Sequence, residues 1–262
     1  MWNFTHTFFK SFSIESSTRG KIFFDNTLDE YLIITRHNVI GIYSYKKALL
    51  ELKKEIELFA NIKHIKRIPS SSPNRSDYFF CLSDDLSFTF CTLDNGELVS
   101  LYHGEVSFPS SALLELDEIK VIADTDQYYY TQNYSFGGYK YVAVQAYKEI
   151  LNIFPFRYSN EGEIKVDKPF PIRMIQENII DIVALDPRAY KSPKNMIGIL
   201  CNDSYQKGPN VFQAFQAIEL NIQAQELNKK ISWELVLPKD VNMFRVVELP
   251  EGAIIIFAEN HV

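Results

Sequence analysis

Short apolar runs separated by polar turns recur along the whole chain. Each run is about four to eight residues long, is rich in β-branched and aromatic residues, and ends at Asp, Asn, Gly or Ser, which is the pattern of β-hairpins. Such hairpins are predicted to start near Asp29, Asp77, Lys140, Asn195 and Glu251. Their spacing of roughly 50 to 60 residues is typical of β-propeller blades.

Further strand candidates fill the intervals between these hairpins. They are Ile62–Ile68, Glu97–Tyr102, Ile119–Ala123, Ile179–Leu185, Trp233–Leu237 and Phe244–Leu249. Two extra strands in each interval give four-stranded blades. We therefore predict an all-β chain with little or no helix, folded as a partial (open) β-propeller of about five four-stranded blades.

One segment has the local pattern of a helix. Leu49, Leu52, Ile56 and Phe59 recur at helical spacing among good helix formers. We nevertheless predict a pair of strands here, because the preceding hairpin needs partners and because of the resemblance described below. The segment Phe212–Asn228 is similarly ambiguous.

The predicted loops do not divide the chain. They are Pro69–Asp77, Ser107–Ser111, Tyr158–Lys168 and Pro187–Lys194. None is long or biased enough for an interdomain linker, so residues 1–262 are predicted to form one incomplete propeller that ends within a blade. Because a propeller hides its sheet edges by closing, we expect a fragment, a split gene product, or a chain that needs further blades in cis or in trans.

Composition supports a folded chain and gives no support for a phosphate-binding face. Apolar residues make up 46% of the sequence, which is too many for a disordered chain. The net charge is −6, whereas nucleic-acid-binding domains are usually basic. Because Glu51, Glu55 and Glu57 interrupt the densest basic stretch, we interpret it as a mixed, solvated face. That stretch comprises Lys46, Lys47, Lys53, Lys54, Lys63, Lys66 and Arg67.

Cysteine usage and the first residues indicate an intracellular protein. Cys81, Cys91 and Cys201 each lie in an apolar, strand-like run, which is the usual setting of a reduced core thiol. The first residues lack the basic and apolar regions of a secretory signal. No apolar run is long enough to span a bilayer, so no membrane partner is expected.

The common catalytic and cofactor motifs are missing from the sequence. There is no Gly-x-Ser-x-Gly elbow, phosphate-binding loop or dinucleotide fingerprint, and Gly137-Gly138 is interpreted as a turn. The five histidines, none at metal-ligand spacing from a Cys or His partner, are His6, His37, His64, His103 and His261. We therefore predict a protein that is not an enzyme, with no catalytic, cofactor or metal site.

Two groups of residues leave alternatives open. Asp84, Asp85, Asp124 and Asp126 are interpreted as turn residues, although spaced carboxylates also serve propeller glycosidases, which makes a hydrolase the least favoured alternative. The tyrosine-rich segment Tyr128–Tyr139 either stacks on bases or a partner peptide, or alternates between core and surface.

Several segments resemble, in collinear order, the first-propeller region of one protein family. They are Lys54–Phe59, Leu101–Val106, Phe170–Met174, Asn178–Leu185, Gln225–Lys229 and Val246–Ile256. This family includes the large damaged-DNA-binding-protein subunit, the large cleavage-and-polyadenylation factor subunit and a spliceosomal subunit. His103-Gly104 and Gly252–Ile256 make the damaged-DNA-binding type the best match. The sequence departs from the family at Asp124–Asp126 and Tyr128–Tyr139.

The resemblance implies a binding function. Members of the family are several times longer than this chain and build three propellers, of which this chain would supply most of the first. The implied role is a non-enzymatic adaptor that links a cullin-type ubiquitin ligase to substrate receptors in DNA repair. A nuclear, or nuclear and cytoplasmic, location is expected, with the cullin held by the rest of the protein and any nucleic acid contacted indirectly. The alternative is a propeller subunit of an mRNA 3′-end processing or splicing complex. No partner-binding residue is carried over.

Overall fold

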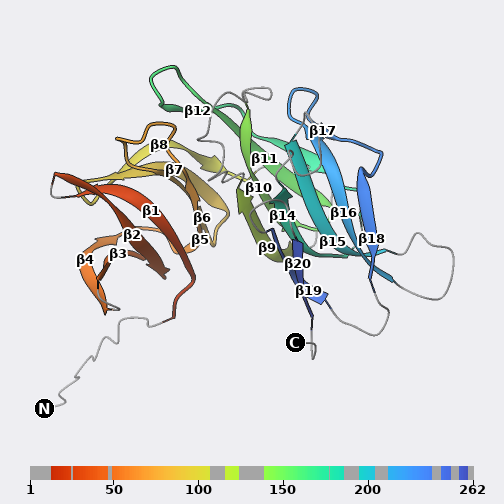
Figure 1. Cartoon of the computed structure of the whole chain (residues 1–262), viewed down its shortest axis with the longest axis horizontal. Helices are drawn as coiled ribbons and strands as arrows, with labels where there is room; N and C mark the ends of the chain where they lie inside the picture. The colour runs from red at the N-terminus through yellow and green to blue at the C-terminus, as the bar shows by residue number, and fades with distance from the viewer. Residues whose placement is uncertain are drawn as a thin grey trace, which may run out of the picture. The chain divides into compact units, whose positions relative to one another are not determined.

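All regular structure in the described part of the chain is β-strand. The computed structural model describes residues 13–24, 26–46, 49–106, 116–123, 139–176, 178–185, 195–203, 212–237, 243–248 and 254–258. The chain divides into two compact units, Met1–Glu105 and Val106–Val262 (Figure 1). The all-β prediction is confirmed, and a single propeller over residues 1–262 stays a prediction. Among the described residues there is no helix that could cross a membrane.

The first unit contains two antiparallel meanders, each of four consecutive strands. The first meander is β1 (Ser16–Phe24), β2 (Thr27–Arg36), β3 (Val39–Lys46) and β4 (Leu49–Glu57). The second is β5 (Ile62–Ile68), β6 (Tyr78–Ser83), β7 (Ser87–Asp94) and β8 (Glu97–Glu105). A parallel bridge between Phe23 and Asp94 joins β1 to β7, so the two meanders form one continuous sheet.

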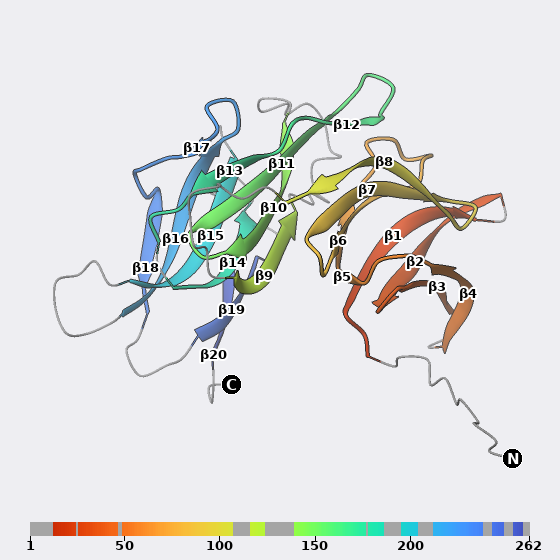
Figure 2. The same cartoon turned by 180° about the vertical axis from the view of Figure 1, so that it is seen from behind.

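The second unit also contains successive antiparallel meanders, but the outer position of its two larger sheets is occupied by two short strands in place of one long strand (Figure 2). Its first sheet is β9 (Leu116–Ala123), β10 (Lys140–Tyr147), β11 (Ile150–Tyr158), β12 (Ile164–Val166) and β13 (Phe170–Arg173). Its second sheet is β14 (Ile179–Leu185), β15 (Asn195–Asp203), β16 (Phe212–Asn221), β17 (Glu226–Leu227) and β18 (Trp233–Val236). The short strands β12 and β13 both pair with β11, and β17 and β18 both pair with β16. A final antiparallel pair is β19 (Met243–Glu248) and β20 (Ile254–Ala258).

In the first unit the core lies between the two meanders of the sheet, and in the second unit the cores lie between consecutive sheets. In the first unit, one face of β1–β4 packs on β5–β7 through Ile22, Tyr31, Ile33, Ile40, Ile42, Ile62, Ile65, Phe79, Cys81, Cys91 and Leu93. In the second unit, β10, β11 and β13 pack on β14–β16 through Tyr141, Ala143, Leu151, Ile153, Phe170, Ile172, Ile179, Ile182, Ile197, Ile199, Cys201, Ile218 and Leu220. The other face of the β14–β18 sheet packs against Ile254 and Ile256 of β20.

The first strands of successive meanders lie side by side within each unit. Strand β1 lies beside β5, and β14 lies beside both β9 and β19. Face-to-face packing of successive meanders, with their first strands adjacent, is the arrangement of propeller blades. None of these sheets closes on itself. The predicted open, partial propeller is therefore confirmed at the level of its blades.

Most predicted strands are confirmed, with two corrections. Leu49–Phe59 is extended as predicted, but it forms the single outermost strand β4 and not a pair of strands. The predicted loop Tyr158–Lys168 contains the short strand β12. Phe212–Asn228 holds β16 and β17, whereas the predicted loops Ser107–Ser111 and Pro187–Lys194 lie outside the described residues.

A two-residue turn fixes the register of β7 and β8. Asn95 and Gly96 both have positive φ, 47° and 72°, as an Asn-Gly hairpin turn requires. A Cβ at Gly96 would also lie 2.6 Å from the Phe24 ring. The turn therefore needs glycine for both its backbone conformation and its space.

Candidate functional site

A buried carboxylate ties the two blades of the first unit together. Asp77 Oδ2 accepts hydrogen bonds from the Lys21 backbone N–H at 2.7 Å and from Arg67 Nε at 2.6 Å, and Oδ1 accepts one from the Ser70 N–H at 2.9 Å. The Asp77 and Arg67 side chains are 3% and 15% exposed. Because a buried ion pair needs good geometry and extra hydrogen bonds to offset desolvation, the two backbone donors are part of the site.

This site corrects one interpretation of the basic stretch. Arg67 is a mostly buried partner of Asp77 and does not belong to a solvated face. The solvated-face interpretation holds for Lys53, which pairs with Glu51 at 2.8 Å, and for Lys63, which pairs with Glu15 at 3.1 Å. Lys47 and the Lys46 side chain lie outside the described residues.

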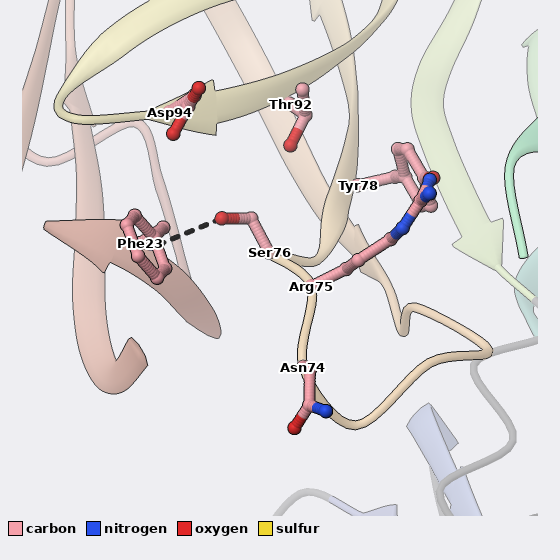
Figure 3. A pocket seen from close by; sticks show the side chains of 7 residues that line it. All are labelled: Phe23, Asn74, Arg75, Ser76, Tyr78, Thr92 and Asp94. Atoms are coloured by element: carbon pink, nitrogen blue, oxygen red, sulfur yellow. Dashed lines mark hydrogen bonds between the residues drawn. The ribbon is translucent and has the colours of Figure 1, made fainter. Parts of the chain in front are cut away.

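A pocket of about 300 Å³ lies next to the Asp77 site. It is lined by Phe23, Asn74, Arg75, Ser76, Tyr78, Thr92 and Asp94 (Figure 3). Ser76 Oγ accepts a hydrogen bond from the Phe23 N–H at 2.8 Å, and Figure 3 shows the Arg75 side chain directed toward Tyr78. The charged groups of the lining are the Arg75 guanidinium and the Asp94 carboxylate. One cation and one anion favour polar contacts with a bound group over acid–base catalysis.

The two described candidate carboxylates of the hydrolase alternative serve the β6–β7 turn. Asp85 Oδ1 accepts hydrogen bonds from the hydroxyls of Ser83 and Ser87 and from the Ser87 N–H. The Ser83 and Ser87 hydrogen bonds lower the Asp85 pKa to about 2. Asp84 Oδ2 accepts a hydrogen bond from Asn61 Nδ2 at 2.8 Å. This supports the turn interpretation of these two residues. Asp124 and Asp126 lie outside the described residues.

The described histidines are spread over three places. His37 lies in the β2–β3 turn, His64 on β5 and His103 on β8. Burial, reinforced by the positive charges of Lys66 and Lys63, lowers the His64 pKa to about 4. No group of three potential metal ligands occurs among the residues that the structure describes. His6 and His261 lie outside those residues.

The three cysteines are buried thiols. Cys81 and Cys91 have their Sγ atoms 3.8 Å apart on adjacent strands, and Cys201 is buried on β15. Cys81 pairs with Thr89, so Cys91 is its diagonal neighbour, a position whose Cα distance is too long for a disulfide. The neighbouring Cys81 thiol and burial raise the pKa of Cys91. These two thiols suit a core position and not a nucleophile.

Exposed apolar side chains collect on the outer strands of the blades. On the edge of the first blade, Tyr45, Leu50 and Leu52 are 67%, 52% and 46% exposed, and we name these three residues the β4 patch. The register pairs Tyr45 with Leu50 and Tyr43 with Leu52, which places all four side chains on one face of the sheet. Because side chains alternate along a strand, this face is opposite the one that Ile40 and Ile42 bury in the core.

A polar pair borders the β4 patch on the same face. Arg36 Nη2 lies 2.7 Å from Glu55 Oε1, and the Arg36 guanidinium carbon lies 6.0 Å from the centre of the Tyr43 ring. Gly41 leaves room for that ring, since a Cβ there would lie 2.6 Å from Tyr43 Cε2. An apolar centre with a polar border is typical of protein-binding surfaces.

Other outer strands share this exposure. Val99 and Leu101 are exposed on β8, and Trp233, Leu235 and Val236 are exposed on β18. Sequence reasoning named no partner-binding residues. The leucines at the start of β4 were a sequence signal for an exposed apolar surface. Because apolar residues recur at helical spacing in this segment, they resembled the buried face of a helix.

The tyrosine-rich segment is almost wholly outside the described residues, as is Gly137-Gly138. Its last residue, Tyr139, is half-buried, and its ring lies 5.8 Å from the Arg157 guanidinium carbon. The choice between stacking on a ligand and alternation between core and surface therefore stays open for Tyr128–Gly138.

A comparison with the models of known protein families finds no match for this chain. A comparison with curated proteins finds none either. The observations that bear on function are therefore the blades, the exposed outer strands and the sequence resemblance given above.

Proposed function

We propose that this chain is a non-enzymatic protein-interaction scaffold whose β4 patch receives partner proteins. The observation that carries the proposal is the β4 patch, in which three large apolar side chains sit together on a free sheet face. Single exposed apolar residues are ordinary, whereas adjacent ones bordered by polar groups mark interaction sites. Tyrosine supplies a large, rigid contact area at low entropic cost, and Tyr45 is the most exposed of the three side chains.

We further propose that the scaffold is the adaptor type that joins a cullin-type ubiquitin ligase to substrate receptors. Three of the segments that carry the sequence resemblance support this proposal, because most of their residues lie on strands. Lys54–Glu57 lies within β4, Phe170–Arg173 is β13, and Ile179–Leu185 is β14. Lys54–Glu57 is the most informative of these segments, because its local sequence favours a helix whereas the resemblance implies a strand.

The proposal is tested by affinity capture of the full chain from cells, with bound proteins quantified by mass spectrometry. The Leu50→Ser/Leu52→Ser variant is compared with the wild type, and Leu101→Ser on β8 is the matched control because it is also an exposed leucine on an outer strand. We expect substrate receptors to be enriched by the wild type and by the control, and to be lost from the double variant.

Two results would contradict this account. Enrichment of RNA-processing subunits in place of receptors would overturn the ubiquitin-ligase assignment and favour the 3′-end processing or splicing alternative. Equal capture by the wild type and the Leu50→Ser/Leu52→Ser variant would overturn the assignment of the β4 patch as the partner surface. The urea unfolding midpoint of the double variant must match that of the wild type, so that loss of capture reports on the surface.

A further inference from the structure

The loop between β5 and β6 carries a Ser-Pro sequence whose proline is exposed. Ser72 is followed by Pro73, and Arg75 stands three residues after Ser72. Pro73, Asn74 and Arg75 are exposed and Ser72 is half-buried. The remaining serines of the loop lack a following proline, so Ser72 differs chemically from its neighbours.

The tip of this loop is a tight turn. The Arg75 N–H donates a hydrogen bond to the Ser72 carbonyl at 3.4 Å. Proline and asparagine, at the two central positions, suit a type I turn. The turn brings the backbone of Arg75 next to that of Ser72, so the long Arg75 side chain can reach a group attached to the Ser72 hydroxyl by turning away from Tyr78.

The base of the loop is fixed to the blades. The Ser72 N–H donates to Ser70 Oγ at 3.2 Å, and the Ser70 N–H donates to the Asp77 carboxylate. Ser70 is buried, and Ser76 Oγ accepts a hydrogen bond from the Phe23 N–H. These contacts fix Ser70 and Ser76 to the blades, whereas Pro73, Asn74 and Arg75 of the turn are exposed.

We propose that Ser72 is a phosphorylation site for a proline-directed serine/threonine kinase, and that Arg75 pairs with the attached phosphate. In this reaction Ser72 Oγ attacks the γ-phosphorus of ATP, the new Oγ–P bond forms, and the bond from that phosphorus to the β–γ bridging oxygen breaks. The hydroxyl proton passes to the kinase's catalytic carboxylate, and ADP leaves.

Recognition of Ser72 by the kinase depends on two nearby residues, Pro73 and Arg75. Proline has no N–H and a fixed φ, so it is accepted after the acceptor serine only by kinases whose site accommodates it. The exposed Arg75 adds a positive charge on the same turn. The inference goes beyond the proposed scaffold function and does not depend on it.

The phosphate would change the charge of this surface. A phosphoserine adds a charge of about −1.5 to −2 at neutral pH together with strong acceptor oxygens, and a nearby arginine can bind them through charge-assisted hydrogen bonds. Asp77 has the same sign of charge and is already bonded to Arg67. The exposed guanidinium of Arg75 is therefore the expected partner of the phosphate.

The first experiment incubates the folded full chain with ATP and a kinase of the cyclin-dependent class, and maps the modified residue by mass spectrometry. We expect phosphate on Ser72 and its loss in both Ser72→Ala and Pro73→Ala. Ser71→Ala is the matched control, because Ser71 is an exposed neighbour without a following proline, and it should be modified like the wild type. A peptide of residues 66–79 confirms that the kinase is active.

Three outcomes would overturn the site. They are phosphate on Ser71, phosphate only on Ser192 (which also precedes a proline), and modification of the peptide without modification of the folded chain. The urea unfolding midpoint of Pro73→Ala must equal that of the wild type, which separates loss of recognition from unfolding.

A second measurement tests the role of Arg75. The phosphoserine of the modified chain is titrated by phosphorus NMR in the wild type and in Arg75→Ala. A phosphate paired with Arg75 should lose its second proton at lower pH in the wild type than in the variant. Equal titration midpoints would overturn the pairing while leaving the phosphorylation site intact.

Discussion

Strands β6 and β4 both begin with large apolar residues, but these residues lie in opposite environments. Strand β6 (Tyr78–Ser83) is buried along its whole length, whereas the first four residues of β4 (Leu49–Glu57) are exposed. Strand β6 is a central strand with partners on both edges, and β4 is the last strand of its meander. Apolar side chains of a central strand therefore stabilise the fold, whereas those at the edge of a blade stay exposed and can contact a partner.

The largest expected loss of stability comes from removing the carboxylate at the start of β6. Asp77→Ala leaves Arg67 and two backbone N–H groups without their acceptor, so the free energy of unfolding should fall by about 3–5 kcal/mol. Urea unfolding of the full chain measures the change. Asp94→Ala is the matched control, because Asp94 is an exposed aspartate of the same unit, and its effect should be within about 0.5 kcal/mol.

Truncation of one side chain on each strand tests the comparison directly. Phe79→Ala empties a fully buried position and should cost about 3–5 kcal/mol. Leu52→Ala on β4 removes a side chain that is nearly half exposed and should cost far less, within about 1 kcal/mol. Equal losses in urea unfolding would mean that β4 is as buried as β6.

Close approach of β1 to β6 gives a smaller, conditional effect. A Cβ at Gly20 would lie 2.6 Å from the Phe79 ring, so Gly20→Ala should cost about 1–3 kcal/mol through overpacking. In a Phe79→Leu background the ring is gone, and the same substitution should cost less. A double-mutant cycle measures this coupling. Additive changes in the free energy of unfolding would show that a Cβ at position 20 does not clash with the Phe79 ring.

The pH dependence of stability provides the smallest expected effect. The His64 pKa falls from 6.5 to about 4 on folding, so between these values the unfolded chain binds more protons. Stability contributed by neutral His64 is therefore complete above pH 6.5 and is lost as the pH falls toward 4. In His64→Gln the urea unfolding midpoint should depend less on pH over this window than it does in the wild type. An unchanged slope would contradict burial of this ring.

Local pattern predicted the strands well and the contacts between blades poorly. The predicted bounds of β5 and β14 match the structure, because each is a short, β-branched run between polar turns. Strand β4 required the family resemblance, since its pairing with β3 overrides a local preference for helix. Strand β12 was missed because only three residues form it.

The Asp77–Arg67 pair could not be predicted from sequence alone. The two residues are ten positions apart on different segments, and nothing in the alternation of β5 shows which of its basic residues turns inward. The β4 patch is similar, because the register of β3 and β4 sets which leucines lie beside Tyr45. Both sites depend on tertiary pairing, which periodicity does not encode.

Hydrogen exchange on the full chain tests the central claim that β6 belongs to the interior and β4 to a free edge. The account predicts slow exchange for the amides of β6, which has paired strands on both sides. In β4 it predicts an alternating pattern, with slow exchange only for amides bonded to β3 and fast exchange for those on the free edge. Uniform protection along Leu49–Glu57, as a helix or a central strand would give, would contradict the account.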